Sequence, residues 1–472
     1  MKVEQLFTGC LSEMAYYIES NGEAAVIDPL RETDPYIRMA QADNAEIKYI
    51  FLTHFHADFV SGQYDLAQKT GATIVFGPNA KADYDIYVAK DGEEFPLGGI
   101  TLKLIHTPGH TMESSSIVLI DKDGKMPYLF TGDALFIGDV GRPDLAVKSD
   151  LTEADLAGHL FESLRNKIMS FPDDIIIYPN HGAGSACGKN MSSETFDTLG
   201  NQKKTNYALR ADMTKEEFIK EVTTGLKTPP QYFPKNVRMN KTINTSIDEV
   251  IHRGTTPLDA ATFKEMSEQK DVLVVDTRSK ESYTFEGTVP GAWYIGLDGV
   301  FAPWVGTLIT DIDQKIIFIA EDETRVNEIA VRFSRVGYDN TLGYLFGGIK
   351  NWVDHGYEVD KIGSISAVQF AKRLAEGSME KPLDVRKESE YISQHIIGVE
   401  NFPLNYIHSN FAEIDPEKEY FLHCETGYLS LIATSIFKAN GVKKVYDVRG
   451  GFNDIIETDA PVSEYVCPTT LL

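Results

Sequence analysis

The segment THFHADFVSG, residues 53–62, decides how the N-terminal half of the chain is interpreted. It places His54, His56 and Asp58 within five positions, shortly after the apolar run KYIFL. Imidazole and carboxylate groups are common ligands of zinc and iron in proteins. The next residue, Phe59, has no lone pair. The segment therefore combines three potential metal ligands with a side chain that cannot bind a metal.

Further potential ligands follow other short apolar runs, which are typical of β-strands. These runs are TIVFG, TLKLIHTPGH, SSIVLID, YLFTGD and DIIIYPNH, and the residues near their ends include His106, His110, Asp133 and His181. Because functional residues gather on loops at the ends of strands, we expect these side chains to converge at one edge of a sheet. A single histidine such as His159 is better explained as a hydrogen-bonded structural residue, whereas this joint pattern predicts a metal site.

Length, charge and cysteine content limit the remaining possibilities. The chain has 472 residues, which is too many for one core and suggests about three domains. Its formal net charge of −25 argues against a nucleic-acid partner. We find neither an apolar run of about 18 residues nor a positively charged apolar leader, so we expect no membrane association. The four cysteines are widely spaced, which argues against a disulfide framework and predicts a cytoplasmic protein.

The C-terminal half contains an internal repeat. VLVVDTRSKESY from residue 272 matches KPLDVRKESEY from residue 381, and IIFIAEDETRVNEIAVRFSRVGYDNTLGYLFGG matches EYFLHCETGYLSLIATSIFKANGVKKVYDVRGG. Each copy alternates strands with helices, as α/β domains do. Residues 229–240, PPQYFPKNVRMN, are interpreted as a linker packed on the surface. We therefore predict three domains, spanning residues 1–240, 241–360 and 361–472.

The ligand pattern of the first domain, HxHxD followed by GH, GD and H, resembles the metallo-β-lactamase family. The resemblance implies an αββα sandwich, in which two metals share seven protein ligands. Six of these ligands are matched here, by His54, His56, Asp58, His110, Asp133 and His181. The seventh position, normally a histidine of the second metal, is Phe59. A two-zinc hydrolase is therefore less expected than a site with a single metal.

Within that family, the chain is similar to persulfide dioxygenases in THFHADFVSG, TPGHT, TGDALFIGDVGRPDL and YPNHGAGSACGKN. The resemblance implies one Fe(II) per chain, with zinc as a substitute on purification, held by His54, His110 and Asp133. By the same resemblance, His56, Asp58 and His181 orient the ligands and water. Spacing alone leaves another choice open, because His54, His56 and His110 would also form a plausible zinc site of three histidines.

The expected substrates are a low-molecular-weight thiol persulfide and O2, and the expected products are sulfite and the thiol. Arg142, in GRPD, is a candidate for binding a carboxylate or phosphate of the carrier thiol, and its alternative role is a surface salt bridge. Cys187 lies shortly after His181 and is a candidate to lie near the site, although a small buried residue in a tight loop explains it better.

In the second copy of the repeat, FLHCETGYLS places Cys424 between an apolar run and an expected amphipathic helix. Backbone N–H groups of such a loop, at the positive end of a helix, favour a thiolate. This loop, together with DVR at 384 and VRGG at 448, resembles rhodaneses, which carry sulfur as a cysteine persulfide. The resemblance implies Cys424 as the catalytic residue, with substrate contacts from Arg386, Glu425, Thr426, Gly427, Tyr428, Leu429 and Ser430.

Two positions depart from the rhodanese pattern. Leu429 stands where such loops commonly carry an arginine, which weakens the case for binding thiosulfate or sulfite. Arg386 and Arg449 are candidates to compensate, although both are equally explained as residues of the fold. In the first copy the residue aligned with Cys424 is Glu321, and a carboxylate cannot carry sulfur. We therefore expect residues 241–360 to be catalytically silent and to act in spacing, docking or assembly.

As a whole, the chain resembles persulfide dioxygenase–rhodanese fusions. The fold class implied is α/β, an αββα sandwich followed by two domains with central parallel sheets. The implied function is persulfide oxidation coupled to sulfane-sulfur transfer, which together could give thiosulfate. The alternatives are a zinc thiolesterase like glyoxalase II and a non-catalytic persulfide carrier or sensor. The family also suggests a homo-oligomer, either a dimer or a tetramer, while the carrier thiol stays open between glutathione, coenzyme A and others.

Overall fold

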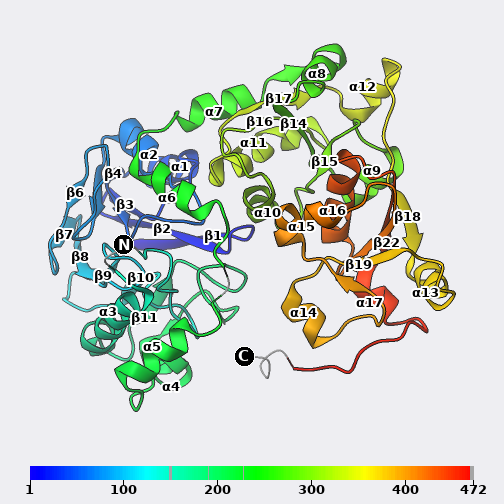
Figure 1. The fold of residues 1–472 in the computed structure, drawn as a ribbon. Helices are drawn as coiled ribbons and strands as arrows, with labels where there is room; N and C mark the ends of the chain where they lie inside the picture. The colour runs from blue at the N-terminus through cyan, green and yellow to red at the C-terminus, as the bar shows by residue number, and fades with distance from the viewer. Residues whose placement is uncertain (148–150, 190, 227, 468–472) are drawn as a thin grey trace. The chain divides into compact units, whose positions relative to one another are not determined.

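The computed structural model describes residues 1–147, 151–189, 191–226 and 228–467. Its contacts divide the chain into two compact units (Figure 1). The first consists of Met1–Ile247 with Ser334–Gly337, and the second of the segments that begin at Asp248 and Tyr338. Each unit is considered by itself below.

The first unit is built on two six-stranded sheets, with the strand orders β1-β2-β3-β4-β5-β6 and β12-β11-β10-β9-β8-β7. The strands of the first sheet are β1 Lys2–Thr8, β2 Glu13–Ser20, β3 Glu23–Ile27, β4 Glu46–Leu52, β5 Thr73–Phe76 and β6 Tyr87–Val88. Those of the second sheet are β7 Glu94–Leu97, β8 Ile100–His106, β9 Ser115–Ile120, β10 Tyr128–Gly132, β11 Ile176–Pro179 and β12 Asp197–Thr198. All six runs that were expected to form strands do so.

Apolar side chains of the two sheets meet in a shared core. Tyr16 and Phe51 from the first sheet pack in the same cluster as Leu102 and Phe130 from the second. The rings of Tyr16 and Phe130 meet edge to face, with centroids 4.9 Å apart. Strand β2 has nearly every residue buried, because helices cover its other face. This explains why its sequence, EMAYYIES, does not alternate between apolar and polar residues.

Helices form the outer layers. On the first sheet lie α1 (Asp34–Ala42), α2 (Gln63–Thr70) and α6 (Phe233–Lys241). On the second lie α3 (Glu153–Asn166), α4 (Leu199–Thr205) and α5 (Lys215–Thr223). Helix α3 begins with a capping box between Thr152 and Asp155, which satisfies two amides of its first turn. The four layers form the αββα sandwich that was expected.

Helix α6 differs from the expected linker, because residues 233–241 are helical. Pro234 lies in its first turn, where a missing N–H is tolerated. The predicted domain end at residue 240 lies inside this helix. Asn240 donates from Nδ2 to the carbonyl oxygens of His56 and Phe59, both at 2.8 Å, and so ties α6 to the ligand-bearing loop. Sequence periodicity missed the helix because its stabilising contacts are polar and long-range.

The second unit contains two five-stranded sheets with equivalent orders, β13-β17-β16-β14-β15 and β18-β22-β21-β19-β20. All of their strand pairs are parallel. The first sheet contains β13 Pro257–Leu258, β14 Val272–Asp276, β15 Trp293–Tyr294, β16 Lys315–Ile319 and β17 Thr341–Leu345. The second contains β18 Gly363–Ser366, β19 Lys381–Asp384, β20 Glu400–Asn401, β21 Glu419–His423 and β22 Lys444–Arg449. The repeat in the sequence is thus a repeat in the fold.

The helices of the two copies also correspond. After α7 (Ile247–Gly254), the first copy has α8 Ala260–Ser267, α9 Lys280–Glu286, α10 Phe301–Leu308, α11 Val326–Arg335 and α12 Gly348–Asp354. The second copy has α13 Ala367–Ala375, α14 Glu388–Ser393, α15 Ile407–Asn410, α16 Tyr428–Ala439 and α17 Gly451–Ile455. Within the described residues, no helix combines the length and the apolar character needed to cross a membrane.

Candidate functional site

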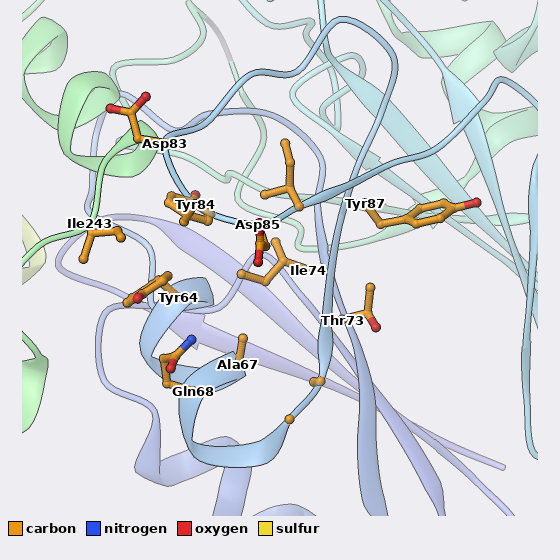
Figure 2. A pocket seen from close by; sticks show the side chains of 13 residues that line it. Tyr64, Ala67, Gln68, Thr73, Ile74, Asp83, Tyr84, Asp85, Tyr87 and Ile243 are labelled. Carbon is orange, nitrogen blue, oxygen red and sulfur yellow. The ribbon is translucent and has the colours of Figure 1, made fainter.

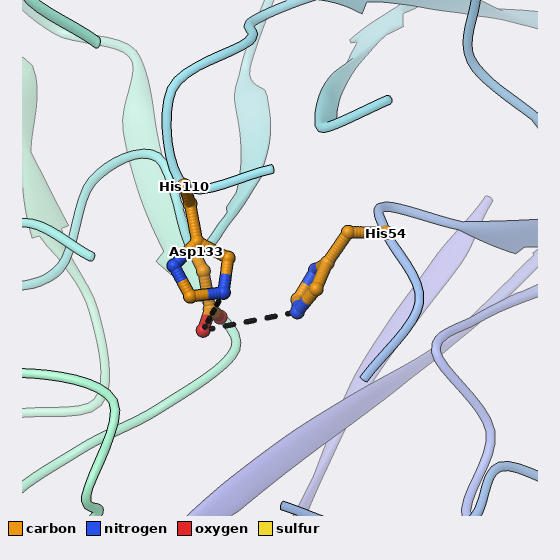
Figure 3. Close-up of side chains that lie close together, drawn as sticks. All are labelled: His54, His110 and Asp133. Carbon is orange, nitrogen blue, oxygen red and sulfur yellow. Dashed lines mark ion pairs between the residues drawn. The ribbon is translucent and has the colours of Figure 1, made fainter. Parts of the chain in front are cut away.

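The strands of the N-terminal unit bring the predicted metal ligands together. His54 follows β4 of the first sheet, while His110 lies between β8 and β9 and Asp133 directly follows β10 of the second. Ligand atoms of these three buried residues lie within 4.8 Å of one another (Figure 3). His56, Asp58 and His181 form a second buried group with the same spacing. All six predicted positions therefore lie in two adjoining groups at the strand ends.

Hydrogen bonds fix the orientation of both imidazoles in the first group. His110 Nδ1 lies 2.9 Å from the carbonyl oxygen of Arg142, which can only accept, so Nδ1 carries the proton. His54 Nδ1 lies 3.0 Å from the hydroxyl oxygen of Thr53, whose own proton goes to Asp28. In both rings the lone pair is consequently on Nε2. Outer hydrogen bonds of this kind orient metal-binding histidines.

The Nε2 atoms of His54 and His110 both face the carboxylate of Asp133, an arrangement that a cation would stabilise. His110 Nε2 lies 3.4 Å from Asp133 Oδ2 and His54 Nε2 lies 3.9 Å from the same oxygen, as the dashed lines of Figure 3 mark. Burial, together with the neighbouring imidazoles, lowers the pKa of His54 well below its ordinary value. Lone pairs therefore face a carboxylate. Among the described residues, neither oxygen of Asp133 has a hydrogen-bond partner. Because buried polar atoms are rarely left unpaired, this donor set fits a metal ion.

Asp28, which the sequence analysis missed, organises the pocket from behind. Its carboxylate accepts hydrogen bonds from the backbone and hydroxyl of Thr53, from Nε2 of His56 at 2.9 Å and from Nδ2 of Asn180 at 2.6 Å. It thus supports His54 through Thr53 and holds His56 directly. Asp28 also has a left-handed backbone, with φ of 49°, which is costly for a residue other than glycine. The sequence does contain a signal for Asp28, because it directly follows the apolar strand β3 just as Asp133 directly follows β10.

The second group is arranged differently. Nε2 of His56 is engaged by Asp28, so only its Nδ1 remains to face an ion. Burial opposes a charge on His56, but the Asp28 carboxylate raises its pKa above the ordinary value. His181 Nε2 lies 3.5 Å from Asp58 Oδ2, and among the described residues neither atom has a hydrogen bond. Phe59 is fully buried and stacks on the His56 ring at a centroid distance of 4.3 Å. The group retains three donors, with an apolar ring where a fourth would lie.

Cys187 is buried beside the same pocket. Its sulfur lies within 4.8 Å of ligand atoms of Asp133 and His181. Burial raises the pKa of this thiol well above its ordinary value, and the nearby carboxylates of Asp58 and Asp133 add to the effect. Both interpretations of this residue therefore hold, because the thiol is buried and also adjoins the candidate metal ligands.

Arg142 is buried, and its guanidinium forms a two-pronged salt bridge with Asp144 and donates to the carbonyl oxygen of Ala186. The salt-bridge alternative is therefore present, although it is not on the surface. Binding of a substrate anion by Arg142 stays a prediction. The preceding residue, Gly141, is required by close packing, because a Cβ atom there would lie 2.0 Å from the carbonyl oxygen of Asp133.

In the second unit, Cys424 lies between β21 and the first turn of α16, as expected. Only 1% of its surface is exposed. Its sulfur accepts a hydrogen bond from the backbone N–H of Gly427 at 3.2 Å, and the Ser430 hydroxyl lies 3.6 Å away. Gly427 has φ of 93°, a conformation that favours glycine. Since the positive end of the α16 dipole also faces the loop, the arrangement favours negative charge on sulfur.

The other predicted loop residues lie around this sulfur in different environments. Glu425 pairs with Arg386, Thr426 is exposed, and Leu429 is half-buried in the first turn of α16. The Tyr428 hydroxyl donates to the carbonyl oxygen of Gly296 in the first copy, at 2.9 Å. One copy of the repeat thus holds the loop of the other.

Arg386 is engaged by the fold. Its guanidinium binds both oxygens of Asp384 and lies 3.9 Å from the centroid of the Phe452 ring. The aligned Arg278 forms the same pair with Asp276 in the first copy. Because the pair recurs in a copy without a cysteine, it supports a structural role, and substrate binding by Arg386 stays a prediction.

In the first copy, Glu321 occupies the position aligned with Cys424 and has a structural role. The Glu321 carboxylate accepts hydrogen bonds from the backbone N–H of Ser279 at 2.8 Å and from the Ser282 hydroxyl at 2.6 Å. Burial opposes the charge, but these bonds lower the pKa of Glu321 below its ordinary value. The carboxylate therefore anchors the start of α9, and this position offers no sulfur nucleophile.

A separate hollow of about 670 Å³ lies between α2 and the segment that leads to β6 (Figure 2). Tyr64, Tyr84, Asp83 and Asp85 line it, together with Ile243. It contains none of the predicted site residues, and we assign it no role.

The sandwich with its His and Asp pocket, followed by two parallel-sheet copies, defines a class of metal-binding α/β protein with rhodanese-like domains. Residues 8–181 match the family described as the metallo-beta-lactamase superfamily. Residues 259–355 and 366–458 each match the rhodanese-like domain. A metallo-beta-lactamase from Staphylococcus aureus subsp. aureus COL is 31% identical, with a TM-score of 0.63 over 73% of this chain and 98% of its own. The chain belongs to the metallo-beta-lactamase superfamily.

Two further solved structures match the N-terminal half. ETHE1 from Myxococcus xanthus is 27% identical over 51% of this chain and 100% of its own, with a TM-score of 0.42. The B3 metallo-beta-lactamase BLEG-1 is 22% identical over 44% of this chain and 100% of its own, with a TM-score of 0.34. At these TM-scores neither match bears on function.

Proposed function

We propose that the N-terminal pocket oxidises a low-molecular-weight thiol persulfide with O2 at a single Fe(II), and that Cys424 carries sulfane sulfur. The overall reaction converts R–S–SH, O2 and water into R–SH, sulfite and two protons. The observation that carries the proposal is the group of three donors formed by His54, His110 and Asp133. Two neutral imidazoles and one carboxylate leave other positions of a metal open, as in non-haem iron oxygenases.

The residues of the chain have distinct roles in this proposal. His54 and His110 present Nε2 lone pairs, and Asp133 supplies the negative charge that balances the cation. Asp28, acting through the Thr53 hydroxyl, keeps His54 in the required tautomer, and the carbonyl of Arg142 does the same for His110. When bound, Fe(II) supplies the redox chemistry that brings O2 and the terminal sulfur together. The buried walls, which include Phe59 and Cys187, exclude bulk water from the persulfide.

Cys424 would act by nucleophilic attack on the outer sulfur of a persulfide. The thiolate takes that sulfur and releases the carrier thiol, and the resulting cysteine persulfide is stabilised by the Gly427 N–H. Transfer of the same sulfur to sulfite would give thiosulfate. Leu429 provides no positive charge for sulfite, so this last transfer depends on the loop amides and nearby cations.

A second candidate is a zinc thiolesterase like glyoxalase II. It is favoured by one observation, namely that His56, Asp58 and His181 lie close enough together to bind a second ion. Two metals would hold a hydroxide that attacks an acyl-thiol. The absence of a ligand at Phe59 weighs against it.

Metal analysis combined with oxygen uptake distinguishes the candidates. The full chain is purified without oxygen, its iron and zinc are measured, and glutathione persulfide, coenzyme A persulfide and S-lactoylglutathione are each supplied. One iron per chain with oxygen uptake and sulfite release supports the proposal. Two zinc ions with thioester hydrolysis and no oxygen uptake would identify the thiolesterase. Persulfide labelling of Cys424 without turnover at either site would identify a carrier or sensor.

We also propose that the protein works in the cytoplasm as a homo-oligomer, either a dimer or a tetramer, without nucleic-acid or membrane partners. Cys10, Cys187 and Cys424 are free thiols, which is compatible with a reducing compartment. Light scattering coupled to size-exclusion chromatography tests the assembly, and a monomeric mass would contradict it.

A further inference from the structure

Asp447 is a buried carboxyl group on β22, a strand whose neighbouring side chains are otherwise mostly apolar. Its Oδ1 lies 2.6 Å from the hydroxyl oxygen of Ser430, on the first turn of α16. The same hydroxyl oxygen lies 3.6 Å from the sulfur of Cys424. One hydroxyl therefore bridges a buried carboxyl group and the sulfur that the rhodanese-like loop presents.

A hydroxyl has one proton to donate, so the bridge has two states. When Asp447 is ionised, Ser430 donates to the carboxylate and gives no hydrogen bond to sulfur. When Asp447 is protonated, its O–H donates to the Ser430 oxygen, and Ser430 can donate to Cys424. The second state stabilises a thiolate and the first state does not. While the pair retains one proton, the negative charge is therefore either on the sulfur or on the carboxyl group.

The surroundings of Asp447 allow it to hold a proton near neutral pH. Burial raises the pKa of its carboxyl to about 7, against the opposing effects of the Ser430 hydrogen bond and of the cations of Lys280 and Arg449. Lys280 belongs to α9 of the first copy, and Arg449 is two residues along the same strand. Its strand neighbours, Ser364 on β18 and Leu422 on β21, carry no charge.

We propose that Asp447 accepts the proton of the Cys424 thiol through Ser430, so that the two residues share one proton. This inference rests on the proposed sulfur-carrying role of Cys424. Asp447 does not touch the reacting sulfur, so it is a positioning residue that acts through Ser430.

The proton transfer balances without any additional reactant. The thiol proton moves to the Ser430 oxygen while the Ser430 hydroxyl proton moves to Asp447 Oδ1, leaving a thiolate and a neutral carboxyl group. Attack on the outer sulfur of R–S–SH then forms a new S–S bond and breaks the original one. The outer sulfur keeps its own proton, the departing R–S⁻ takes a proton from water and leaves as the thiol, and Asp447 can return its proton to the cysteine by the same route after the sulfur leaves.

The test is the pH profile of Cys424 alkylation in the full-length protein, measured on the Cys424 peptide by mass spectrometry. Coupled groups titrate in macroscopic steps that belong to the pair. For the wild type we expect reactivity to rise in two transitions, at least about one pH unit apart. Asp447→Asn retains a donor to Ser430 but cannot ionise, so it should show a single transition. Asp459→Asn, at an exposed carboxylate of the same domain, should keep both transitions.

A second variant keeps the test decisive if Asp447→Asn fails to fold. Ser430→Ala removes the bridge, so it should also show one transition, at a higher pH than in Asp447→Asn because the thiolate loses a donor. A single wild-type transition that superposes on that of Asp447→Asn would overturn the proposal, and so would two transitions in Ser430→Ala. Persulfide uptake by Cys424 is measured separately. Two transitions without uptake would leave the shared proton standing and refute the sulfur-carrying role.

Discussion

The metal pocket and the cysteine loop both form where strands end, but they satisfy their polar atoms in different ways. In the pocket, buried oxygens of Asp58 and Asp133 have no hydrogen bond from any described residue. In the loop, the Cys424 sulfur and the Asp447 carboxyl group both find partners within the chain. The pocket is thus incomplete without an added cation, whereas the cysteine and the carboxyl group of the loop already have partners.

This difference predicts that the two sites respond differently to removal of a metal ion. A chelator removes the cation that completes the pocket. It should therefore abolish chemistry at the metal site and leave the cysteine loop intact. Conversely, the loop depends only on covalently attached groups. Each of the following substitutions tests this contrast, and they are ordered by the size of the expected effect.

Cys424→Ser should reduce sulfane-sulfur transfer to the uncatalysed rate, because a hydroxyl cannot carry sulfur as a persulfide. Oxygen uptake and sulfite formation should be unchanged, since the metal ligands all belong to the other unit. Transfer to cyanide or sulfite and oxygen consumption are measured on the same sample. Loss of oxygen uptake in this variant would show that the two sites are not independent.

His110→Ala should lose the metal, because it removes one of the two imidazoles whose lone pairs face Asp133. The expected loss of affinity exceeds the roughly 10–100-fold that a missing supporting group usually causes. Metal content and oxygen uptake should fall together while Cys424 still becomes persulfidated. His159→Ala, at a histidine outside both donor groups, is the matched control and should retain the metal.

Asp28→Asn should weaken metal binding by roughly 10–100-fold while every ligand stays in place. An amide can accept on one side only, so some of the hydrogen bonds from Thr53, His56 and Asn180 are lost. Competition with a chromogenic chelator measures the affinity. Asp91→Asn serves as the control, because this carboxylate pairs with Lys167 and accepts from the His106 amide but belongs to neither donor group. An unchanged affinity would show that Asp28 does not organise the pocket.

Phe59→His should raise the metal content from one ion toward two per chain, because it restores a fourth donor beside His56, Asp58 and His181. Replacing a fully buried ring by a polar one should also cost about 1–3 kcal/mol of stability in the metal-free protein. Elemental analysis and thermal unfolding measure the two effects. A metal content that stays at one would indicate that Phe59 does not limit occupancy.

Much of the fold could be predicted because local patterns and global architecture agree. The apolar runs before His54, Asp133 and His181 are strands, and the internal repeat corresponds to two equivalent sheets. Helix α6 could not be predicted in this way. Its sequence is polar and contains proline, and its position is fixed by Asn240, which binds the backbone of residues about 180 positions earlier.

The sites were predictable where one residue type carries the chemistry, as with the histidines and Cys424. The supporting groups were harder to find. Asp28 had the same signal as Asp133 but no counterpart in a recognised motif, and Asp447 is one charged residue among three in its strand. Their roles depend on hydrogen bonds to residues that are distant in sequence or one strand away. Spacing along the chain cannot express such contacts.

The carboxylate of Glu321 has a consequence for any attempt to place a sulfur nucleophile in the first copy. It holds the start of α9 through Ser279 and Ser282, so the position is now part of the local scaffold. Exchanging Glu321 for cysteine would remove that anchor without supplying the serine or the carboxyl group of the working loop, since Asn327 and Tyr344 occupy the aligned positions. A single substitution at Glu321 would therefore not reproduce the cysteine loop of the second copy.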